Sequence, residues 1–259
     1  MRVSGTVAPR YQPQTGKCWR TIFAPNGVDV KEFGAECTGS LSNAATDTPA
    51  IQNALAYALS IEPAVVRLPG NGLCATNATL TVGNGVSIKE LGAYNFSGFA
   101  AASASLNPMI SLSGFNAGLS DLYMDGAASG SPPTGTLLYF APAVGKTFAK
   151  NLYIYRSCTA LDVNGYLQDI SDVYIANPNG AACDVITVGR STTGASTTNT
   201  LFDHVSVYDL SPAVAAANSC FRIYDAGGIF ITHSDAVKCA TGTIIKPGTN
   251  QIVILADPR

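Results

Sequence analysis

Asn151-Leu152-Tyr153-Ile154 and Asp172-Val173-Tyr174-Ile175 are the two segments that determine the predicted fold. Each places an apolar residue on either side of a tyrosine, which is the period-two alternation of a strand with one buried and one outward side. Triplets of the same kind occur at Leu122–Met124, Val205–Val207, Ile229–Ile231 and Ile252–Ile254. We interpret them as one strand that recurs once in every structural repeat.

A second family of apolar strands falls between these triplets. Its members are Ile110–Leu112, Leu138–Phe140, Leu161–Val163, Ile186–Val188, Phe221–Ile223 and, less regularly, Ile244–Ile245. The first family begins at residues 122, 152, 173, 205, 229 and 252, so its members recur every 21 to 32 residues. Short strands at this period predict a solenoid, because one coil cannot bury its inward side chains until a neighbour stacks on it. We therefore expect an all-β protein, a right-handed parallel β-helix, in a single domain.

The alternation also predicts which side chains face outward. The central residues of the triplets should lie outside, and these are Tyr123, Tyr153, Tyr174, Ser206 and Phe230. The residues just before the triplets form a column of turn residues, namely Asp121, Asn151, Asp172 and His204, followed by Gly228 and Gln251. Asn and Asp side chains hydrogen-bond to turn backbones and to one another in stacked coils. We predict a structural ladder there.

The chain divides into three parts. Residues 1–27 are rich in Pro and Gly and form an N-terminal arm, residues 28–98 are the first part of the β-helix, and residues 99–259 are its further coils. Asp47-Thr48-Pro49 begins a capping helix of about residues 48–60, in which Ile51, Leu55 and Leu59 share one face. No capping segment follows the last strand, Gln251–Leu255, so we expect the final coil to continue into further sequence or to dock on another subunit.

Composition excludes several classes of protein. Only 12% of the residues are charged and the net charge is −2, without a basic stripe, so no nucleic-acid partner is expected. No apolar run is long enough for insertion into a membrane, and no secretion leader is present, so we expect synthesis in the cytoplasm. The seven cysteines include no C-x-x-C pair, and we expect most of them to be small buried thiols.

Four segments near the N-terminus resemble a known family. Val28–Gly34, Asp47–Leu55, Ala64–Pro69 and Ala78–Ile88 are similar to the opening segment of the pectate-lyase-like superfamily, best known from bacteriophage tailspikes. The resemblance covers residues 28 to 90 well and the remainder only through its coil pattern. It implies the β-helix fold with one capping helix. Tailspikes, particle-bound adhesins and polysaccharide-degrading enzymes all carry this opening.

The function implied by this resemblance is that of a phage-particle tailspike or spike-type adhesin that binds bacterial surface polysaccharide. It further implies a homotrimer, located in the virion as a tail or particle appendage and synthesised in the host cytoplasm. The arm, residues 1–27, would contact other virion proteins. Two alternatives stay open, a polysaccharide-degrading enzyme and a non-catalytic structural adaptor of a virion.

An enzyme of this fold needs catalytic groups at the strand ends. Glycoside hydrolysis uses two carboxylates about 5 to 9.5 Å apart, and stacked coils can supply such pairs. The candidates are Asp125, Asp209, Asp225 and Asp235, with His233 beside the last, although an Asp next to Gly or Ser is also an ordinary turn residue. The Asp-Asp and Arg-Ile-Lys segments of polygalacturonase-like hydrolases are absent, and Phe202-Asp203-His204 only faintly resembles a pectate-lyase segment. A hydrolase is favoured over a lyase.

Aromatic residues give a candidate saccharide-binding surface. Tyr123, Tyr153 and Tyr174 occupy one outward position on three successive coils, with Tyr155 and Arg156 at their edge. Aromatic rings pack on sugars while Arg binds hydroxyls, but outward aromatics can equally meet a neighbouring subunit across a trimer axis or lie under a loop. His204 is expected to be a packed turn residue, and we predict neither a metal site nor a cofactor.

Overall fold

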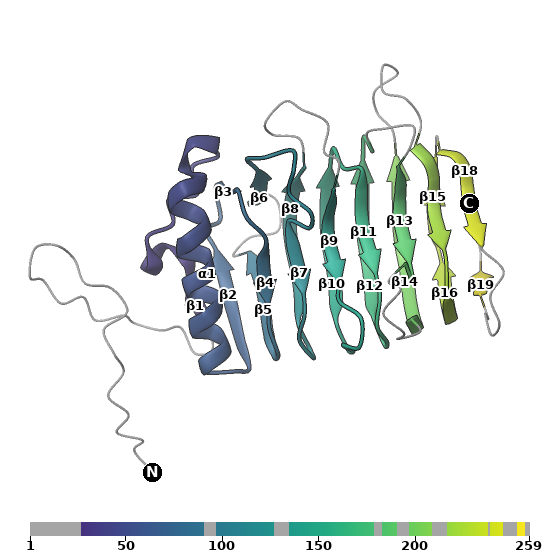
Figure 1. Ribbon diagram of the computed structural model, residues 1–259, viewed down its shortest axis with the longest axis horizontal. Coiled ribbons are helices and arrows are strands. Elements are labelled where there is room, and N and C mark those ends of the chain that lie inside the picture. The colour runs from purple at the N-terminus through teal and green to yellow at the C-terminus, as the bar shows by residue number, and fades with distance from the viewer. Residues whose placement is uncertain are drawn as a thin grey trace, which may run out of the picture.

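The structure is a parallel β-helix with one helix at its N-terminal end (Figure 1). The computed structural model describes residues 27–90, 97–126, 135–178, 183–190, 197–208, 217–237, 239–245 and 253–256. Every strand pairing among these residues is parallel, because the chain makes a full coil before it returns to pair with an earlier strand. The predicted fold class is confirmed. No helix in the described ranges is long and apolar enough to cross a membrane.

Two sheets form the walls of the solenoid. The larger is built in the order β1 (Gly27–Asp29), β2 (Ala64–Leu68), β5 (Val86–Glu90), β8 (Gly118–Asp125), β10 (Phe148–Tyr155), β12 (Asp169–Ala176), β14 (Thr197–Tyr208), β16 (Ala226–Thr232) and β19 (Val253–Ala256). Three short strands join it, β3 (Leu73–Thr76), β6 (Gly98–Ala101) and β17 (Asp235–Ala236). The smaller contains β4 (Leu80–Val82), β7 (Ile110–Leu112), β9 (Thr136–Phe140), β11 (Thr159–Val163), β13 (Asp184–Val188), β15 (Ala217–Ile223) and β18 (Cys239–Ile245).

The strand register confirms most of the predicted repeat. Tyr153 of β10 lies opposite Tyr123 of β8 and Tyr174 of β12, and the residues that flank these tyrosines point into the core. The second family pairs in the same way, with Leu161 opposite Leu138 and Ile186. Each inward side chain is therefore covered by the coils above and below it, which is how a solenoid excludes water from its core.

Two triplets occupy positions other than those predicted. Ile252–Ile254 is shifted by one residue against Ile229–Ile231, because Val253 lies opposite Ile229 and Ile254 lies opposite Phe230. Ile229–Ile231 lies opposite Thr200–Phe202, not opposite Val205–Val207. The strand that continues Val205–Val207 is β17, in which Asp235 lies opposite Ser206. The long strands of this sheet bend near their middle, and both halves alternate apolar and polar residues. Spacing alone could not show to which half a triplet belongs.

A column of left-handed residues forms this bend. Asp121, Asn151, Asp172, His204 and His233 all have φ between 48° and 58°, a conformation that Asn, Asp and His tolerate better than most residues. Asn151 Nδ2 donates a hydrogen bond to Asp121 Oδ1 at 2.8 Å, so the predicted ladder of turn residues is present. Its fifth member is His233 rather than Gly228, which instead aligns with Asn199 in a neighbouring column of positive φ.

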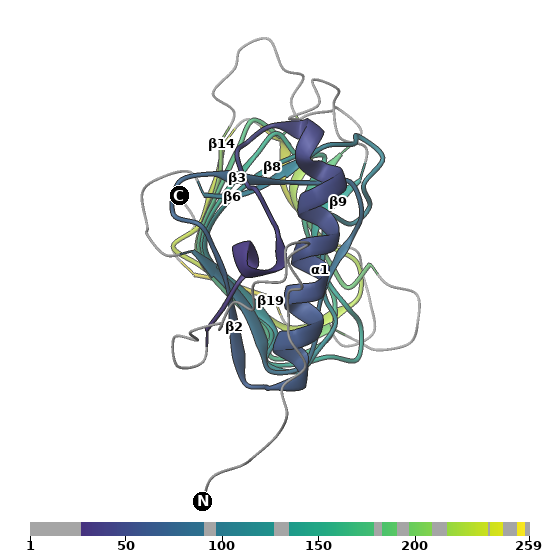
Figure 2. The same ribbon diagram turned by 90° about the vertical axis from the view of Figure 1, so that its left-hand side faces the viewer.

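The first coil is closed by helix α1 (Ala44–Ser60), preceded by the 3-10 turns η1 (Val30–Phe33) and η2 (Leu41–Asn43). Figure 2 shows α1 lying across the end of the solenoid. The helix begins four residues before the predicted start, so Asp47 lies inside its first turn. Its buried carboxylate accepts hydrogen bonds from the backbone N–H groups of Glu36, Cys37 and Ala75 at 2.7, 3.1 and 3.0 Å. Asp47 thus joins three segments rather than capping its own helix.

Two expectations about side chains are wrong. Leu59 does not share the buried face of Ile51 and Leu55, because it is 46% exposed near the end of α1. The cysteines are not mainly free thiols, since three disulfides join Cys37 to Cys74, Cys158 to Cys183 and Cys220 to Cys239. Stacking brings together cysteines that are 19 to 37 residues apart, a separation unrelated to C-x-x-C spacing. Cys18 and the arm before Gly27 lie outside the described residues.

Candidate functional site

Four tyrosines stack on one another along the outer face of the larger sheet, and we call them the tyrosine ladder. The ring centroids of Tyr123 and Tyr153 are 5.5 Å apart, those of Tyr153 and Tyr174 are 5.0 Å apart, and those of Tyr174 and Tyr208 are 5.2 Å apart. The interplanar angles are 18° to 27°. Tyr208 lies two residues beyond Ser206, the register partner of Tyr174, yet its ring completes the stack. Sequence alternation predicted the first three tyrosines and missed the fourth.

This stacking decides which part of each tyrosine can meet a ligand. The ring faces inside the ladder pack against one another, so a ligand alongside it meets ring edges and phenol hydroxyls, one per coil. Burial raises the pKa of Tyr123, and to a lesser extent that of Tyr153, where neighbouring Tyr174 adds to the effect. These phenols therefore stay protonated at neutral pH and can donate as well as accept hydrogen bonds.

An arginine and an acid border the ladder at its N-terminal end. Arg156 Nε and Nη2 bind the two carboxylate oxygens of Asp125 at 3.0 and 2.5 Å, and the guanidinium lies 4.9 Å from the ring centroid of Tyr155. Hydrogen bonding to Asp125 raises the pKa of Arg156. Asn177 Nδ2 donates to the hydroxyl of Tyr155 at 3.2 Å. The predicted saccharide-binding residues are thus neighbours on one surface, while Asp125 is 6% exposed beneath Arg156.

The candidate catalytic acids lie in separate places. Asp125 is on β8, and Asp235 on β17 is four strands away through β10, β12 and β14. At about 4.8 Å per strand this separation is about 19 Å, too far for the carboxylate pair of a glycoside hydrolase. Asp225 lies exposed in the turn before β16, and Asp209 lies outside the described residues. Asp235 Oδ2 accepts a hydrogen bond from the Tyr208 hydroxyl at 3.4 Å and is the main cause of the raised pKa of Tyr208.

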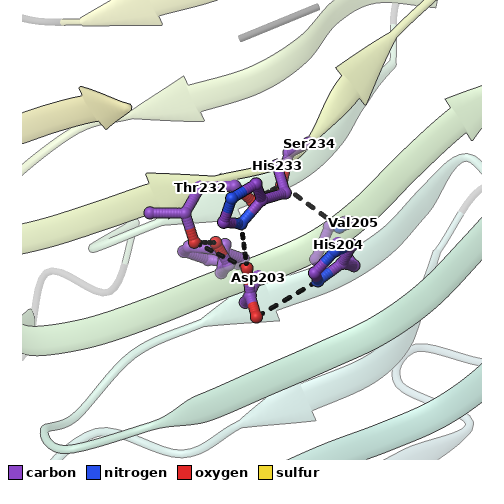
Figure 3. A network of polar contacts seen from close by, with 7 residues as sticks. Asp203, His204, Val205, Thr232, His233 and Ser234 are labelled. Atoms are coloured by element: carbon purple, nitrogen blue, oxygen red, sulfur yellow. Dashed lines mark hydrogen bonds and ion pairs between the residues drawn. The ribbon is translucent and has the colours of Figure 1, made fainter. Parts of the chain in front are cut away.

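His233 belongs to a polar cluster at the bend of the larger sheet (Figure 3). Its Nδ1 lies 2.9 Å from Asp203 Oδ1, and Nδ1 of His204 lies 3.2 Å from Asp203 Oδ2. The two imidazole rings stack at 4.8 Å with an interplanar angle of 15°. Hydrogen bonds from His233 and Thr232 hold the pKa of Asp203 well below its usual range, at about 2. His204 is exposed rather than packed, contrary to expectation, because the left-handed turn points its ring outward.

A pocket that sequence analysis missed lies at the beginning of β10 and β12. It has a volume of about 450 Å³ and is lined by Lys146, Thr147, Phe148, Lys150, Leu167 and Asp169. Lys150 Nζ and Asp169 Oδ2 form an ion pair at 2.5 Å across strands. The residues come from two coils and have no common motif, so only their positions in the register could have grouped them.

No protein-family model and no curated protein matches the chain. Solved structures with the same fold include an alginate lyase from Paenibacillus sp. strain FPU-7, with a TM-score of 0.58 and 16% identity over 89% of this chain and 76% of that one. The Dettilon tailspike protein also matches, with a TM-score of 0.58 and 16% identity. This match covers 88% of the chain and 48% of the tailspike, so the chain spans about half of that protein. The A-module of a mannuronan C-5 epimerase from Azotobacter vinelandii matches with a TM-score of 0.50 and 14% identity over 89% of this chain and 76% of the module. At these identities the matches establish the fold alone.

Proposed function

We propose that the chain is the β-helix of a phage-particle tailspike or spike-type adhesin that binds bacterial surface polysaccharide along the tyrosine ladder. The ladder carries the proposal, because it presents the same phenol group once per coil over four successive coils. A polysaccharide is also a repeating chain of hydroxyl groups. A row of phenols can exchange hydrogen bonds with it at each repeat, while ring edges contact its C–H groups.

The groups at the end of the ladder support a saccharide ligand. Arg156 is oriented by Asp125 and Tyr155, so its guanidinium loses little rotamer freedom when it binds a hydroxyl or an acidic sugar. Of the solved structures described above, two are named as enzymes that act on alginate or mannuronan, and one is named as a tailspike protein. An acidic polysaccharide is therefore the first ligand to test.

The virion location and the trimer rest on the likeness of fold to the Dettilon tailspike protein. The three disulfides are compatible with this placement, because a mature particle meets oxidising surroundings outside the cell. In this proposal three copies of the chain assemble and the arm attaches them to other particle proteins. Finding the protein in purified particles, as a trimer by sedimentation, is the expected result. A monomer absent from particles would contradict this part of the proposal.

The ladder is tested by a double variant, Tyr153→Phe with Tyr174→Phe, which removes two hydroxyls and keeps the stacked rings. Two lost hydrogen bonds of about 1 kcal/mol each should weaken binding about 30-fold. The measurement is binding to a panel of capsular polysaccharides and lipopolysaccharides that includes alginate, with dextran as an uncharged comparison. Tyr139→Phe on the smaller sheet is the matched control and should leave affinity within about twofold. Equal affinity in the double variant, or no binding to any member of the panel, would refute the role of the ladder.

A polysaccharide-cleaving enzyme is the second candidate, and one contact favours it. The Tyr208 hydroxyl donates to Asp235, and His233 lies two residues before Asp235, so a phenol, a carboxylate and an imidazole occur near the C-terminal end of the ladder. Such groups can transfer protons during cleavage. Incubation with the bound polysaccharide should then produce new reducing ends or unsaturated products, and Asp235→Asn should abolish them. Binding without products would leave a non-cleaving adhesin.

A further inference from the structure

We propose that Asp203, His204 and His233 bind a divalent first-row transition cation, zinc foremost, which joins two neighbouring coils. The proposal goes beyond the function proposed above, which requires no metal. The ligands come from β14 and from the turn after β16, so an ion held by them would connect consecutive coils of the larger sheet.

The three residues converge from adjacent coils (Figure 3). Asp203 lies opposite Thr232 in the register, so His204 and His233 follow at equivalent positions in the left-handed column. Their stacked rings and the Asp203 carboxylate offer three ligand atoms that all lie within 4.8 Å of one another. The fold itself brings this set together, because nothing in the linear sequence joins residues a full coil apart.

The distances suit a small cation. Zinc lies about 2.0 to 2.2 Å from imidazole nitrogen and carboxylate oxygen, so two of its ligand atoms are separated by about 3.0 to 3.5 Å. The separations observed here are 2.9 Å from His233 Nδ1 to Asp203 Oδ1 and 3.2 Å from His204 Nδ1 to Asp203 Oδ2, the other oxygen of the same carboxylate. One ligand atom from each of the three residues lies within 4.8 Å of the other two, so the rings must turn to share one ion. Both imidazole side chains are more than half exposed, so the rings can turn slightly towards a common ion without disturbing the core.

Surrounding groups hold the acid and the two strands in place. Thr232 Oγ1 donates a hydrogen bond to Asp203 Oδ1 at 2.7 Å. Ser234 Oγ accepts from the Val205 N–H at 3.1 Å and donates to the Thr232 carbonyl at 2.8 Å, which ties the turn at His233 to β14. Supporting hydrogen bonds of this kind orient metal ligands in proteins.

The donor set selects the class of metal. Two imidazoles and one carboxylate suit zinc, copper, nickel or iron, whereas calcium and magnesium prefer oxygen ligands. Because the cluster lies on the surface, water would complete the coordination. An ion here would also reinforce the contact between β14 and β16 close to the C-terminal end of the tyrosine ladder.

Isothermal titration with ZnCl₂ tests the proposal on the whole chain, prepared without a polyhistidine tag and treated with a chelator. We expect one zinc ion per chain, a rise in Tm on adding zinc, and much weaker binding of CaCl₂. His204→Asn and His233→Asn keep a residue that tolerates the left-handed backbone and remove the ligand. Each should weaken zinc binding by about tenfold or more. Asp225→Asn, an exposed acid in another turn, is the control and should stay within about twofold.

Three results would overturn the proposal: no zinc binding by the unaltered chain, undiminished binding in both histidine variants, or a preference for calcium. Circular dichroism of the metal-free variants checks that they fold, and the two single variants give independent measurements. No polysaccharide is present in the titration. Its outcome is therefore separate from the success or failure of the saccharide-binding proposal.

Discussion

The two ends of the described coil stack differ in how completely they exclude water. At the first coils, α1 covers the core, Asp47 and Ile51 are fully buried, and a disulfide joins Cys37 to Cys74. In β18, by contrast, every residue is half-buried or exposed. Apolar residues near that end are largely exposed, namely Ile245 at 44%, Ile254 at 43% and Leu255 at 45%.

The difference shows that burial in a solenoid depends on what lies on each side of a coil. The middle strands are covered by neighbours on both sides, and the first strands by α1 on one side and by β5 on the other. The same alternating sequence therefore yields full burial in one region and partial burial in another. Stability should be concentrated where the covering is complete.

The largest loss is expected from Asp47→Ala. The carboxylate accepts three backbone hydrogen bonds in a site closed to water, so its removal leaves three N–H groups without their acceptor. We expect the free energy of unfolding to fall by about 3–5 kcal/mol, as measured by urea denaturation. Asp47→Asn keeps an acceptor oxygen and should lose about half as much.

Asp29→Ala is the matched control, because Asp29 accepts one exposed hydrogen bond, from the Lys31 N–H at 2.9 Å. It should cost about 1 kcal/mol or less. If Asp47→Ala were as mild as this control, the view that Asp47 fastens the helix to the first coils would be wrong.

The same substitution made near each end of the coil stack measures the difference in burial directly. Ile88→Ala in β5 removes a fully buried side chain and should cost about 2–4 kcal/mol. Ile245→Ala at the end of β18, where the side chain is 44% exposed, should cost less than about 1 kcal/mol. Urea denaturation of the two variants under the same conditions gives the comparison. Equal losses would mean that Ile245 is covered in solution, for example by a second chain.

The sequence was sufficient to predict the fold because its signals are local and repeated. The alternation seen around Tyr153 and Tyr174 recurs in every triplet, and an Asn or Asp precedes the triplets that begin at Leu122, Leu152 and Val173. The position of Ile229–Ile231 could not be predicted, since two halves of a bent strand carry the same pattern. The start of α1 was misplaced because Asp47 looks like a helix cap, while its true partners lie in other segments.

The candidate site was less predictable because it depends on contacts between coils. Tyr123, Tyr153 and Tyr174 were found by their common register, but Tyr208 joins the stack from a position two residues further along its strand. The cluster of Asp203, His204 and His233 and the three disulfides arise in the same way. Each joins residues whose separation varies with the length of the turns between them. An alignment of coils that treats His204 and His233 as equivalent turn residues could have found the cluster.

Glu90 at the end of β5 gives the smallest effect and tests how tightly the first coils exclude water. It is 5% exposed and its Oε1 has no hydrogen-bond partner, so burial raises the pKa of the carboxyl above its usual 4.5, although a hydrogen bond with Ser97 opposes this. A raised pKa means that the folded state holds the proton more tightly than the unfolded chain. The resulting stabilisation is present below the unfolded pKa and is lost as pH rises through the folded pKa.

Glu90→Gln should therefore be more stable than the unaltered chain at pH 7, by about 1 kcal/mol or less, and equal to it near pH 4. Urea denaturation at the two pH values measures this, with exposed Glu62→Gln as the control, and a less stable Glu90→Gln at pH 7 would show that water reaches this carboxylate.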